Sequence, residues 1–336
     1  MADQLRWGIL GTGNIAKQFA AGVNASQRSA IVAAGSRTLP TARDFIGQYG
    51  IARAHGSYAE LLADPEVDAI YNSLPNSLHH EWTIKALRAG KHVLCEKPFA
   101  MDLRETTEMF DVARQTNRVL VEAFMYRSHP LTKAVVDTIR SGAIGEVRLI
   151  RTSFCYRTTK IDGNVRFAPA LGGGALMDVG CYCISFSRLI AGAEPTSSYA
   201  TARKHPTGVD DIVTAAMHFP GDVLASFTCG MGVQADNTAY VCGTEGYIEI
   251  PVPWKPPVTG AVYTIARGTP PRQDNPAPAK VPPRETRTVD VNMELYGLEA
   301  DDFAAAVIDG RPPVVSESDT VGNMAVLDDM RKQIGL

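Results

Sequence analysis

A glycine-rich turn close to the start of the chain restricts its fold more than any other feature. The apolar run Leu5–Leu10 leads into Gly11-Thr-Gly-Asn-Ile-Ala16, and a helical pattern of apolar residues follows through Val23. Between a strand and a helix, this G-x-G-x-x-A spacing lets the backbone turn tightly and approach a diphosphate, while the helix amino terminus favours negative charge. The predicted dinucleotide-binding residues of this turn are Gly11, Thr12, Gly13, Asn14 and Ile15.

The second predicted strand, Ala30–Gly35, should end beside the adenosine ribose of such a dinucleotide. Enzymes that use NAD place Asp or Glu there, whereas this chain has Ser36 and Arg37. A hydroxyl and a guanidinium suit a 2′-phosphate, because arginine offers a planar fork of donors. A solvated loop cation is the alternative interpretation of Arg37. We predict NADP(H) as the cofactor.

A third loop, residues 73–79, follows the predicted strand Asp68–Asn72. It lies at the carboxyl end of that strand, where open α/β sheets bind their ligands. Two adjacent histidines at the end of this loop diverge on a helix, and no third ligand is spaced to match them, so we predict no metal site. The residues expected to line the cofactor here are Leu74, Pro75, Asn76 and His79.

The order of strand and helix patterns predicts two domains. Strands and helices alternate up to the strand Arg118–Glu122, which is typical of a parallel, doubly wound sheet. After Ala123, strands follow one another with short turns from Glu146 to Ile250, which indicates an antiparallel or mixed sheet. We predict an α/β protein with an N-terminal Rossmann dinucleotide-binding domain (residues 1–123). A C-terminal α+β domain (residues 124–336) would hold a large, mostly antiparallel open sheet.

The remainder of the second domain divides into helices and loops. We predict helices at Leu131–Ser141, Met293–Asp309 and Thr320–Ile334. Residues 251–283 contain ten of the 21 prolines, and we interpret them as surface loops around one strand, Ala261–Ala266.

Composition and charge narrow the possible functions. The net charge is −3, from 33 basic and 36 acidic side chains, without a basic stripe or a block of like charge. This argues against nucleic-acid or membrane partners. The chain enters its first strand without an apolar signal segment, and its six cysteines are scattered without paired spacing. We therefore expect a cytoplasmic protein with free thiols.

Two further motifs carry residue types suited to catalysis. Glu96-Lys97-Pro98 follows the predicted strand His92–Cys95, and Gly172-Gly-Gly-Ala-Leu-Met-Asp178 enters a helix that continues through Tyr182. Asp178 and Tyr182 are four residues apart and therefore share a helical face. Taken singly, these features have simpler interpretations as a turn, a surface carboxylate and a core tyrosine.

In combination, the glycine-rich turn, Glu96-Lys97-Pro98 and Gly172–Tyr182 resemble the Gfo/Idh/MocA oxidoreductase family over essentially the whole chain. The most similar branch contains glucose–fructose oxidoreductase, dimeric dihydrodiol dehydrogenase and NADP-dependent xylose dehydrogenase. The resemblance implies that Lys97 lies near the nicotinamide and the reacting oxygen, and that a cis peptide bond precedes Pro98. It also implies that Tyr182 donates and accepts the proton and that Asp178 binds the substrate. The implied cofactor residues of this motif are Glu96, Lys97 and Pro98.

Two departures from the family refine these expectations. The inositol dehydrogenase branch has a histidine four residues after the aspartate, where this chain has Tyr182, which argues against an NAD-linked inositol role. Glucose–fructose oxidoreductase also has an export signal and an amino-terminal arm that holds its cofactor, whereas about five residues precede the first strand here. We therefore expect NADP(H) to exchange freely.

The implied reaction is hydride transfer between nicotinamide C4 and a carbinol or carbonyl carbon of a sugar or cyclic diol. Tyr182 is the expected acid/base, assisted by Lys97 because a nearby ammonium favours the phenolate. The candidate substrate-binding residues, each of which alone is explained equally by a surface position, are Arg127, His129, Arg166 and Asp178.

Two other functions stay open at this point. One is a ketoreductase that acts on a nucleotide-linked keto-sugar, and the other is a non-catalytic NADP-binding regulator. In either case, the alternating strands of the second domain leave one sheet face in need of cover. We therefore expect a homodimer or homotetramer that associates through the C-terminal sheet.

Overall fold

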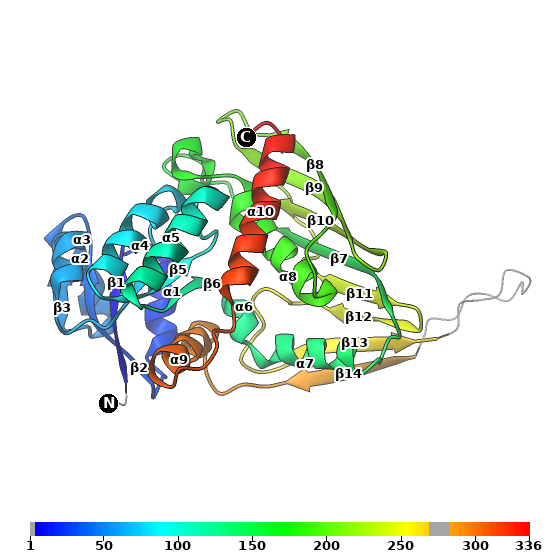
Figure 1. The fold of residues 1–336 in the computed structure, drawn as a ribbon, viewed down its shortest axis with the longest axis horizontal. Helices are drawn as coiled ribbons and strands as arrows, with labels where there is room; N and C mark the ends of the chain where they lie inside the picture. Colours follow the sequence, from blue (N-terminus) through cyan, green and yellow to red (C-terminus); the bar gives the residue numbers. More distant parts are fainter. Residues whose placement is uncertain (1–3, 269–282) are drawn as a thin grey trace, which may run out of the picture.

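The structure is a computed structural model that describes residues 4–268 and 283–336. Figure 1 shows two units side by side, each built around one β-sheet, with helices α8 and α10 between the second sheet and the first unit. This is the α/β fold that the sequence predicts, with a parallel sheet followed by a mostly antiparallel one.

The first sheet has the strand order β3-β2-β1-β4-β5-β6, and every neighbouring pair is parallel. The strand order reverses between β1 and β4, so the loops after these two strands frame a crevice at their carboxyl ends. The strands are β1 Leu5–Leu10, β2 Ser29–Gly35, β3 Arg53–His55, β4 Ala69–Asn72, β5 His92–Glu96 and β6 Leu120–Ala123.

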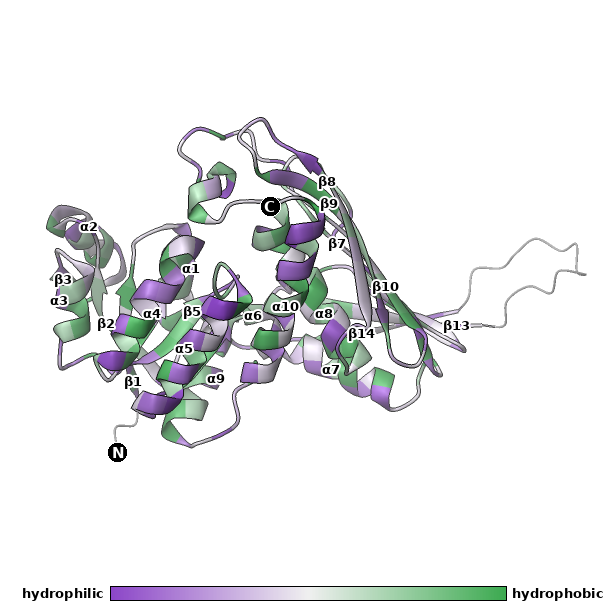
Figure 2. Cartoon of the chain, turned by 45° about the horizontal axis from the view of Figure 1, so that its top comes forward, coloured by the Kyte–Doolittle hydropathy of each residue, from purple (hydrophilic) through white to green (hydrophobic). Residues whose placement is uncertain are grey.

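Amphipathic helices cover this sheet, and Figure 2 shows both hydrophilic and hydrophobic residues on them. Aromatic packing fixes α1 on the sheet, since Phe19 stacks on Tyr71 and meets the edge of Trp7. The helices of this part are α1 Asn14–Val23, α2 Leu39–Tyr49, α3 Tyr58–Ala63, η1 Asn76–Leu78, α4 His79–Arg88 and α5 Leu103–Thr116.

The second sheet has eight strands in the order β14-β13-β12-β11-β7-β10-β9-β8, and only the β7–β10 pair is parallel. Helices α7, α8 and α10 pack on it. Some of its side chains stay open to solvent, such as Tyr199 and Leu224, which are 71% and 53% exposed. The strands are β7 Val147–Cys155, β8 Ser197–Lys204, β9 Asp210–Phe219, β10 Val223–Gly230, β11 Ala239–Gly243, β12 Gly246–Ile250, β13 Ala261–Arg267 and β14 Arg284–Val289.

The helical segments after β6 include a π-helix, η4, that runs directly into α8. Pro169–Ala191 as a whole is apolar and long enough to cross a membrane, but 78% of its most apolar window is buried within the fold. Packing in the core therefore accounts for its apolar character. The segments are α6 Met125–Ser128, α7 Pro130–Arg140, η2 Val165–Phe167, η3 Pro169–Leu171, η4 Leu176–Gly180, α8 Cys181–Ala191, α9 Leu295–Ile308 and α10 Glu317–Gln333.

Two helices near the end of the chain connect the units. Helix α9 packs against α1, α6, β1 and β2, and its Phe303 lies 4.9 Å from Trp7 between ring centroids. Helix α10 packs against α5 on one side and against α8 and β8 on the other. The division of the chain after residue 123 stays a prediction, because α9 returns to the first sheet.

Most predicted elements match the structure within one to three residues, but two features differ. Strand β14 was not predicted, because its sequence Arg-Glu-Thr-Arg-Thr-Val shows no apolar alternation. The predicted loop over residues 269–282 lies outside the described residues. Pro251–Lys255, which we also interpreted as a surface loop, contributes Trp254, a buried side chain whose indole donates to the carbonyl of Ser153.

Candidate functional site

Two cavities meet in the crevice between the sheets. The larger measures about 640 Å³ and lies towards the second sheet, and the smaller measures about 420 Å³ and extends along the loops after β1, β4 and β5. The residues that line both are Asn14, Ile15, Lys97, Arg166 and Asp178. The motifs of the two sheets therefore converge on one place.

The glycine-rich turn has the form that a diphosphate requires. Gly11 has a φ of +89°, which a side chain would strain, and its added Cβ would lie 3.0 Å from Leu74. Helix α1 begins after Gly13 without a side-chain cap, so its first amide groups stay open, and nothing lies within 4 Å of a Cβ placed on Gly13. These residues fit the anionic centre of a dinucleotide.

At the end of β2, Ser36 and Arg37 differ in their surroundings. Ser36 is buried, and its hydroxyl lies 3.5 Å from that of Thr12. Arg37 is exposed, and its guanidinium forms no ion pair with another side chain in residues 4–268 and 283–336.

In the loop after β4, three of the four predicted residues line the smaller cavity, and His79 does not. Leu74, Pro75 and Asn76 are on its wall. His79 is fully buried, with Nδ1 2.9 Å from the carbonyl oxygen of Pro98 and Nε2 2.8 Å from that of Leu74. Burial lowers its pKa to about 4. His79 therefore connects the loops after β4 and β5 and does not line the cavity.

Lys97 and Asp178 form the centre of the site. The peptide bond between Lys97 and Pro98 is cis, as the resemblance implies. The Lys97 ammonium donates to the backbone carbonyl of Asp178 at 2.8 Å and lies 3.4 Å from its carboxylate. Burial lowers the pKa of Lys97, but Asp178, Cys181 and Glu96 outweigh it, so the net shift is upward. Lys97 is therefore a charged ammonium in the resting site.

Asp178 is held by three donors. Besides Lys97, its carboxylate accepts from the Tyr156 hydroxyl at 2.5 Å and from Nε of Arg166 at 2.9 Å. Burial opposes its ionisation, but Lys97 and Arg166 outweigh burial and lower its pKa to about 2. The carboxylate therefore neutralises both cations and holds them at the junction of the cavities.

Tyr182 is 3% exposed and contributes to the wall of the larger cavity. Its hydroxyl lies 3.2 Å from the sulfur of Met125, and the Lys97 ammonium lies 5.1 Å from its ring centroid. Burial, with Tyr296 and Glu96, raises its pKa well above the ordinary value. We expected Lys97 to favour the phenolate, whereas the direction of the pKa shift favours the neutral phenol, chiefly because the side chain is buried.

Of the three basic candidates for substrate binding, the structure brings only Arg166 to the cavity. The Arg127 guanidinium donates to the carbonyl of Val314 and lies 3.5 Å from Asp319, which joins α6 to the start of α10. His129 is buried and caps α7 by accepting from the amide of Leu131. Both residues therefore stabilise the fold away from the cavity.

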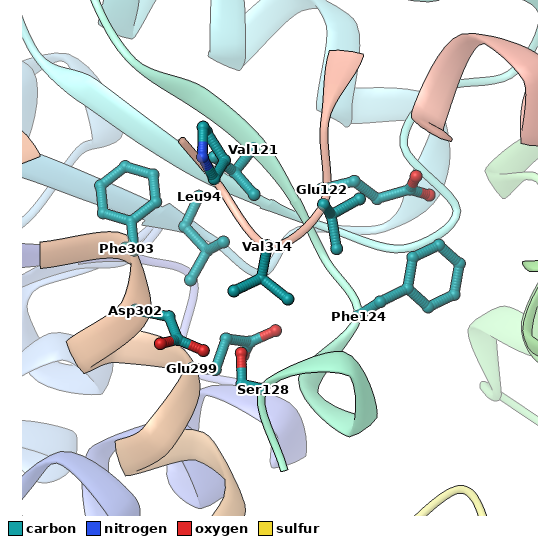
Figure 3. Close-up of a pocket in the computed structure, with 11 residues that line it drawn as sticks. Leu94, Val121, Glu122, Phe124, Ser128, Glu299, Asp302, Phe303 and Val314 are labelled. Carbon is teal, nitrogen blue, oxygen red and sulfur yellow. The ribbon is translucent and has the colours of Figure 1, made fainter. Parts of the chain in front are cut away.

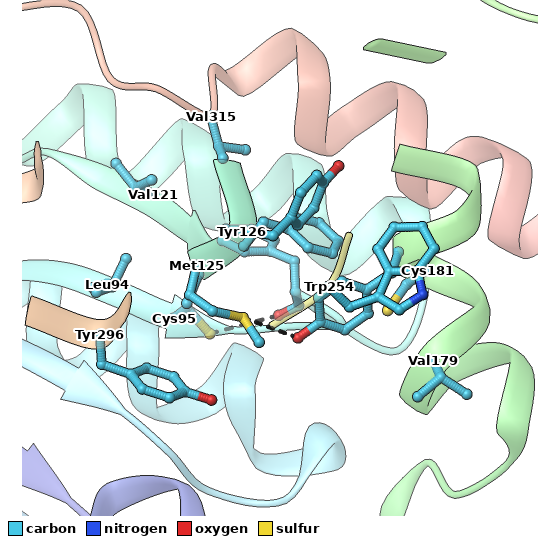
Figure 4. Close-up of a cluster of buried hydrophobic side chains, with 14 of the residues drawn as sticks. Leu94, Cys95, Val121, Met125, Tyr126, Val179, Cys181, Trp254, Tyr296 and Val315 are labelled. Atoms are coloured by element: carbon cyan, nitrogen blue, oxygen red, sulfur yellow. Dashed lines mark hydrogen bonds between the residues drawn. The ribbon is translucent and has the colours of Figure 1, made fainter. Parts of the chain in front are cut away.

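An aromatic wall faces this polar cluster, and sequence reasoning missed most of it. Phe154 stacks on Trp254 at 5.6 Å, and both rings lie against Tyr182. Figure 4 shows Trp254, Met125 and Tyr296 among the buried side chains of this region. Nothing in the proline-rich sequence around Trp254 indicated a cavity wall.

The consecutive glycines before Asp178 allow the two units to approach. A Cβ on Gly172 would lie 2.9 Å from Asn76, whose amide donates to the Gly172 carbonyl at 2.8 Å. Gly174 has a φ of +121°, and its Cβ would lie 2.1 Å from Asp210. Asp210 in turn accepts from the amide of Leu176 at 2.6 Å. The glycines thus let Asp210 cap the π-helix that carries Asp178.

Comparisons with known sequences assign this site to a family. Residues 5–124 match the model of an oxidoreductase family with an NAD-binding Rossmann fold, and residues 132–249 match that of the GFO/IDH/MocA C-terminal domain. The chain belongs to the Gfo/Idh/MocA oxidoreductase family. It is an NAD(P)-binding oxidoreductase, as the resemblance implied, and its fold is that of the family.

Individual relatives cover most of the chain. An uncharacterized oxidoreductase of Rhizobium meliloti is 35% identical over 332 residues, which cover 98% of this chain and 97% of that protein. Human trans-1,2-dihydrobenzene-1,2-diol dehydrogenase is 38% identical over 256 residues, or 75% of this chain and 76% of that protein.

Solved structures agree in fold over nearly the whole length. A 3-ketoreductase from Actinomadura kijaniata, in complex with NADP and TDP-benzene, has a TM-score of 0.87 at 30% identity and covers 98% of both chains. An aldose–aldose oxidoreductase from Caulobacter crescentus has a TM-score of 0.85 at 26% identity, over 98% of this chain and 97% of that one.

Proposed function

We propose that this protein is an NADP(H)-dependent oxidoreductase that transfers a hydride between nicotinamide C4 and a carbinol or carbonyl carbon of a sugar or cyclic diol. The observation that carries the proposal is that Lys97 and Asp178 lie where the two cavities meet, with Tyr182 beside Lys97 on the wall of the larger cavity. The bound cofactor supplies the hydride chemistry, and the protein supplies placement and electrostatics.

NADP(H) is the preferred cofactor of this proposal. The exposed Arg37 guanidinium at the end of β2 offers the planar donors that a 2′-phosphate accepts, and no carboxylate occupies this position to bind the ribose hydroxyls. The related 3-ketoreductase was solved with NADP. The glycine-rich turn and Leu74–Asn76 then bind the dinucleotide, with Glu96, Lys97 and Pro98 near its reactive end.

In this proposal, Tyr182, Lys97 and Asp178 each have a separate role at the substrate. In the reducing direction, the neutral Tyr182 phenol donates a proton to the substrate oxygen, and the Lys97 ammonium stabilises the negative charge that develops there. Asp178 stays ionised, positions Lys97 and Arg166, and accepts a hydrogen bond from a substrate hydroxyl. In the oxidising direction, the same groups act in reverse, and the Tyr182 oxygen accepts the proton.

The lining of the larger cavity suits a ring with one apolar and one hydroxylated side. Phe154 and Trp254 offer an aromatic surface, and Asp178 and Arg166 lie on the polar side. Sugars and cyclic diols share this division of apolar and polar faces. The relatives named as dihydrodiol dehydrogenases and as an aldose–aldose oxidoreductase support this substrate class.

A ketoreductase that acts on a nucleotide-linked keto-sugar is the second candidate. The cavity of about 640 Å³ has room beyond a single sugar ring, and Lys255 lies on its wall, 3.4 Å from Gln18 of α1. A cation at this position suits a diphosphate. The related 3-ketoreductase was solved with TDP-benzene, which favours this candidate over the non-catalytic regulator.

We further propose a cytoplasmic homodimer or homotetramer. The exposed Tyr199 and Leu224 on the second sheet give an apolar surface for a second copy.

The test of the function is absorbance-monitored turnover with NADP(H) and NAD(H) against aldoses, trans-dihydrodiols and nucleotide-linked keto-sugars. Turnover with NADP(H) on one of the first two classes is expected. Turnover only on the third class supports the second candidate, and none on any class contradicts both.

A further inference from the structure

A much smaller cavity lies behind the substrate cavity, among β5, β6, α6, α9 and the segment before α10. It measures about 20 Å³, which is room for one water molecule. Three carboxyl side chains line it, from Glu122, Glu299 and Asp302, together with the Ser128 hydroxyl and apolar groups. No lysine, arginine or histidine of the described chain lines it.

Glu299 is the most unusual of these groups. It is 4% exposed, and neither carboxyl oxygen has a hydrogen-bond partner among the described residues. An ionised carboxylate in such a place is strongly disfavoured without a compensating cation. The titratable groups nearest to it are Glu96 of β5, and Tyr296 and Asp302 of its own helix, none of which is a cation. Glu299 therefore carries a proton.

Helix α9 places three protonatable groups in a row. Tyr296, Glu299 and Asp302 are spaced by three residues, so they follow one face of the helix. Tyr296 lines the substrate cavity, and its buried hydroxyl has no partner among the described residues. Asp302 is half-buried at the other end beside Ser128. Figure 3 shows Glu299, Asp302 and Ser128 pointing toward one another below Val314, while the Glu122 carboxyl points away from them.

We propose that Tyr296, Glu299 and Asp302, with a water molecule in the small cavity, form a proton path along α9 between solvent and the substrate cavity. This inference rests on the proposed function, which consumes or releases one proton in each turnover. In the reducing direction, Tyr182 gives its proton to the substrate oxygen and becomes a phenolate. The path then returns one proton from solvent, through Asp302, the water, Glu299 and Tyr296, to Tyr182.

The path explains why a carboxyl group is tolerated in this interior. A row of neutral hydroxyl and carboxyl groups can both donate and accept, so a proton entering at one end displaces one at the other without a permanent buried charge. The path meets Tyr182 at the larger cavity, because Tyr296 and Tyr182 both line that cavity.

The test compares Glu299→Gln with wild type, and Asp301→Asn is the matched control. Gln keeps the size of Glu but cannot release a proton. Asp301 is on the same helix but bonds to Ser26, outside the row.

In Glu299→Gln we expect one rapid equivalent of NADPH oxidation, because the first proton is already on Tyr182. Steady turnover should then fall by about 100-fold, the lower end of what a positioned proton donor contributes, with a larger solvent isotope effect. Asp301→Asn should behave as wild type.

Infrared spectroscopy gives a second measurement that needs no substrate. The difference between wild type and Glu299→Gln at neutral pH should contain the carbonyl band of one protonated carboxylic acid. A difference spectrum without this band, or an active Glu299→Gln that turns over like wild type, overturns the path. If wild type turns over no substrate, the proposed function fails, and the infrared comparison still decides whether Glu299 holds the proton.

Discussion

Replacing Asp178 with asparagine removes the charge that holds the two cations at the centre of the site. The pKa of Asp178 is about 2 in the folded protein, against an ordinary value of 3.8. At about 1.4 kcal/mol for each pH unit, its ionisation stabilises the fold by about 2 kcal/mol near neutral pH. The substitution keeps the backbone carbonyl that accepts from Lys97. We therefore expect Asp178→Asn to fold, with a free energy of unfolding about 2 kcal/mol lower at neutral pH.

The pH dependence of this difference tests the cause. Because the folded pKa is lowered, the stabilisation is complete above about pH 5 and is lost as the pH falls through the folded pKa of about 2. The difference between wild type and Asp178→Asn should therefore shrink to about half at about pH 3.

Urea unfolding at both pH values measures the difference. The control is Asp222→Asn, since the Asp222 side chain is 92% exposed and asparagine tolerates its φ of +58°. Equal stability of Asp178→Asn and wild type at neutral pH, or a difference that does not change in acid, would refute the electrostatic account.

Three further changes test other parts of the molecule. Arg37→Ser should weaken NADP⁺ binding by about tenfold or more and leave NAD⁺ binding unchanged in calorimetry, as loss of a charged hydrogen bond predicts; equal losses for both cofactors would contradict this role. Gly174→Ala should lower the melting temperature more than Gly142→Ala, because both have positive φ but only Gly174 has Asp210 within 2.1 Å of an added Cβ; equal losses would mean that the close approach is unimportant. Leu224→Lys should yield monomers in sedimentation, whereas an unchanged oligomer, or a monomeric wild type, would contradict association through the second sheet.

The fold was predictable from the sequence where local patterns decide it. The strand and helix around Gly11 follow from apolar runs and a glycine turn, and the antiparallel strands follow from alternation and short turns. Strand β14 was not predicted, because its own sequence is polar and its strand conformation depends on pairing with β13. Helix α9 was predicted as a helix, but nothing local indicates that it packs on the first sheet.

The sequence motifs of the candidate site were predictable, but the aromatic residues that line its larger cavity were not. Lys97, Asp178 and Tyr182 come together as the resemblance implies, because each follows a motif fixed to the end of a strand or the start of a helix. The positions of Trp254 and Tyr156 in the site were not predicted, since they depend on long-range packing. Arg127 was predicted to bind the substrate, but its guanidinium contacts Val314 and Asp319 away from the cavity.

The protonation of Tyr182 was also beyond sequence reasoning. The proximity of Lys97 suggested a phenolate, but the pKa depends on burial and on the partner that Lys97 binds. Asp178 takes that ammonium, and the Tyr182 ring is enclosed by aromatic groups. A neutral phenol is the form of Tyr182 that the proposed mechanism requires for proton donation.

The most direct test of the central claim is NADP⁺ reduction by wild type and Tyr182→Phe, measured by absorbance against aldoses, polyols and trans-dihydrodiols, with NADP⁺ binding measured alongside. Phenylalanine keeps the ring that Lys97 lies over and removes only the hydroxyl. The account predicts turnover in wild type and a loss of at least about 100-fold in Tyr182→Phe with unchanged NADP⁺ binding. Equal turnover in both proteins, or tight NADP⁺ binding without turnover in wild type on any substrate in either direction, would contradict it.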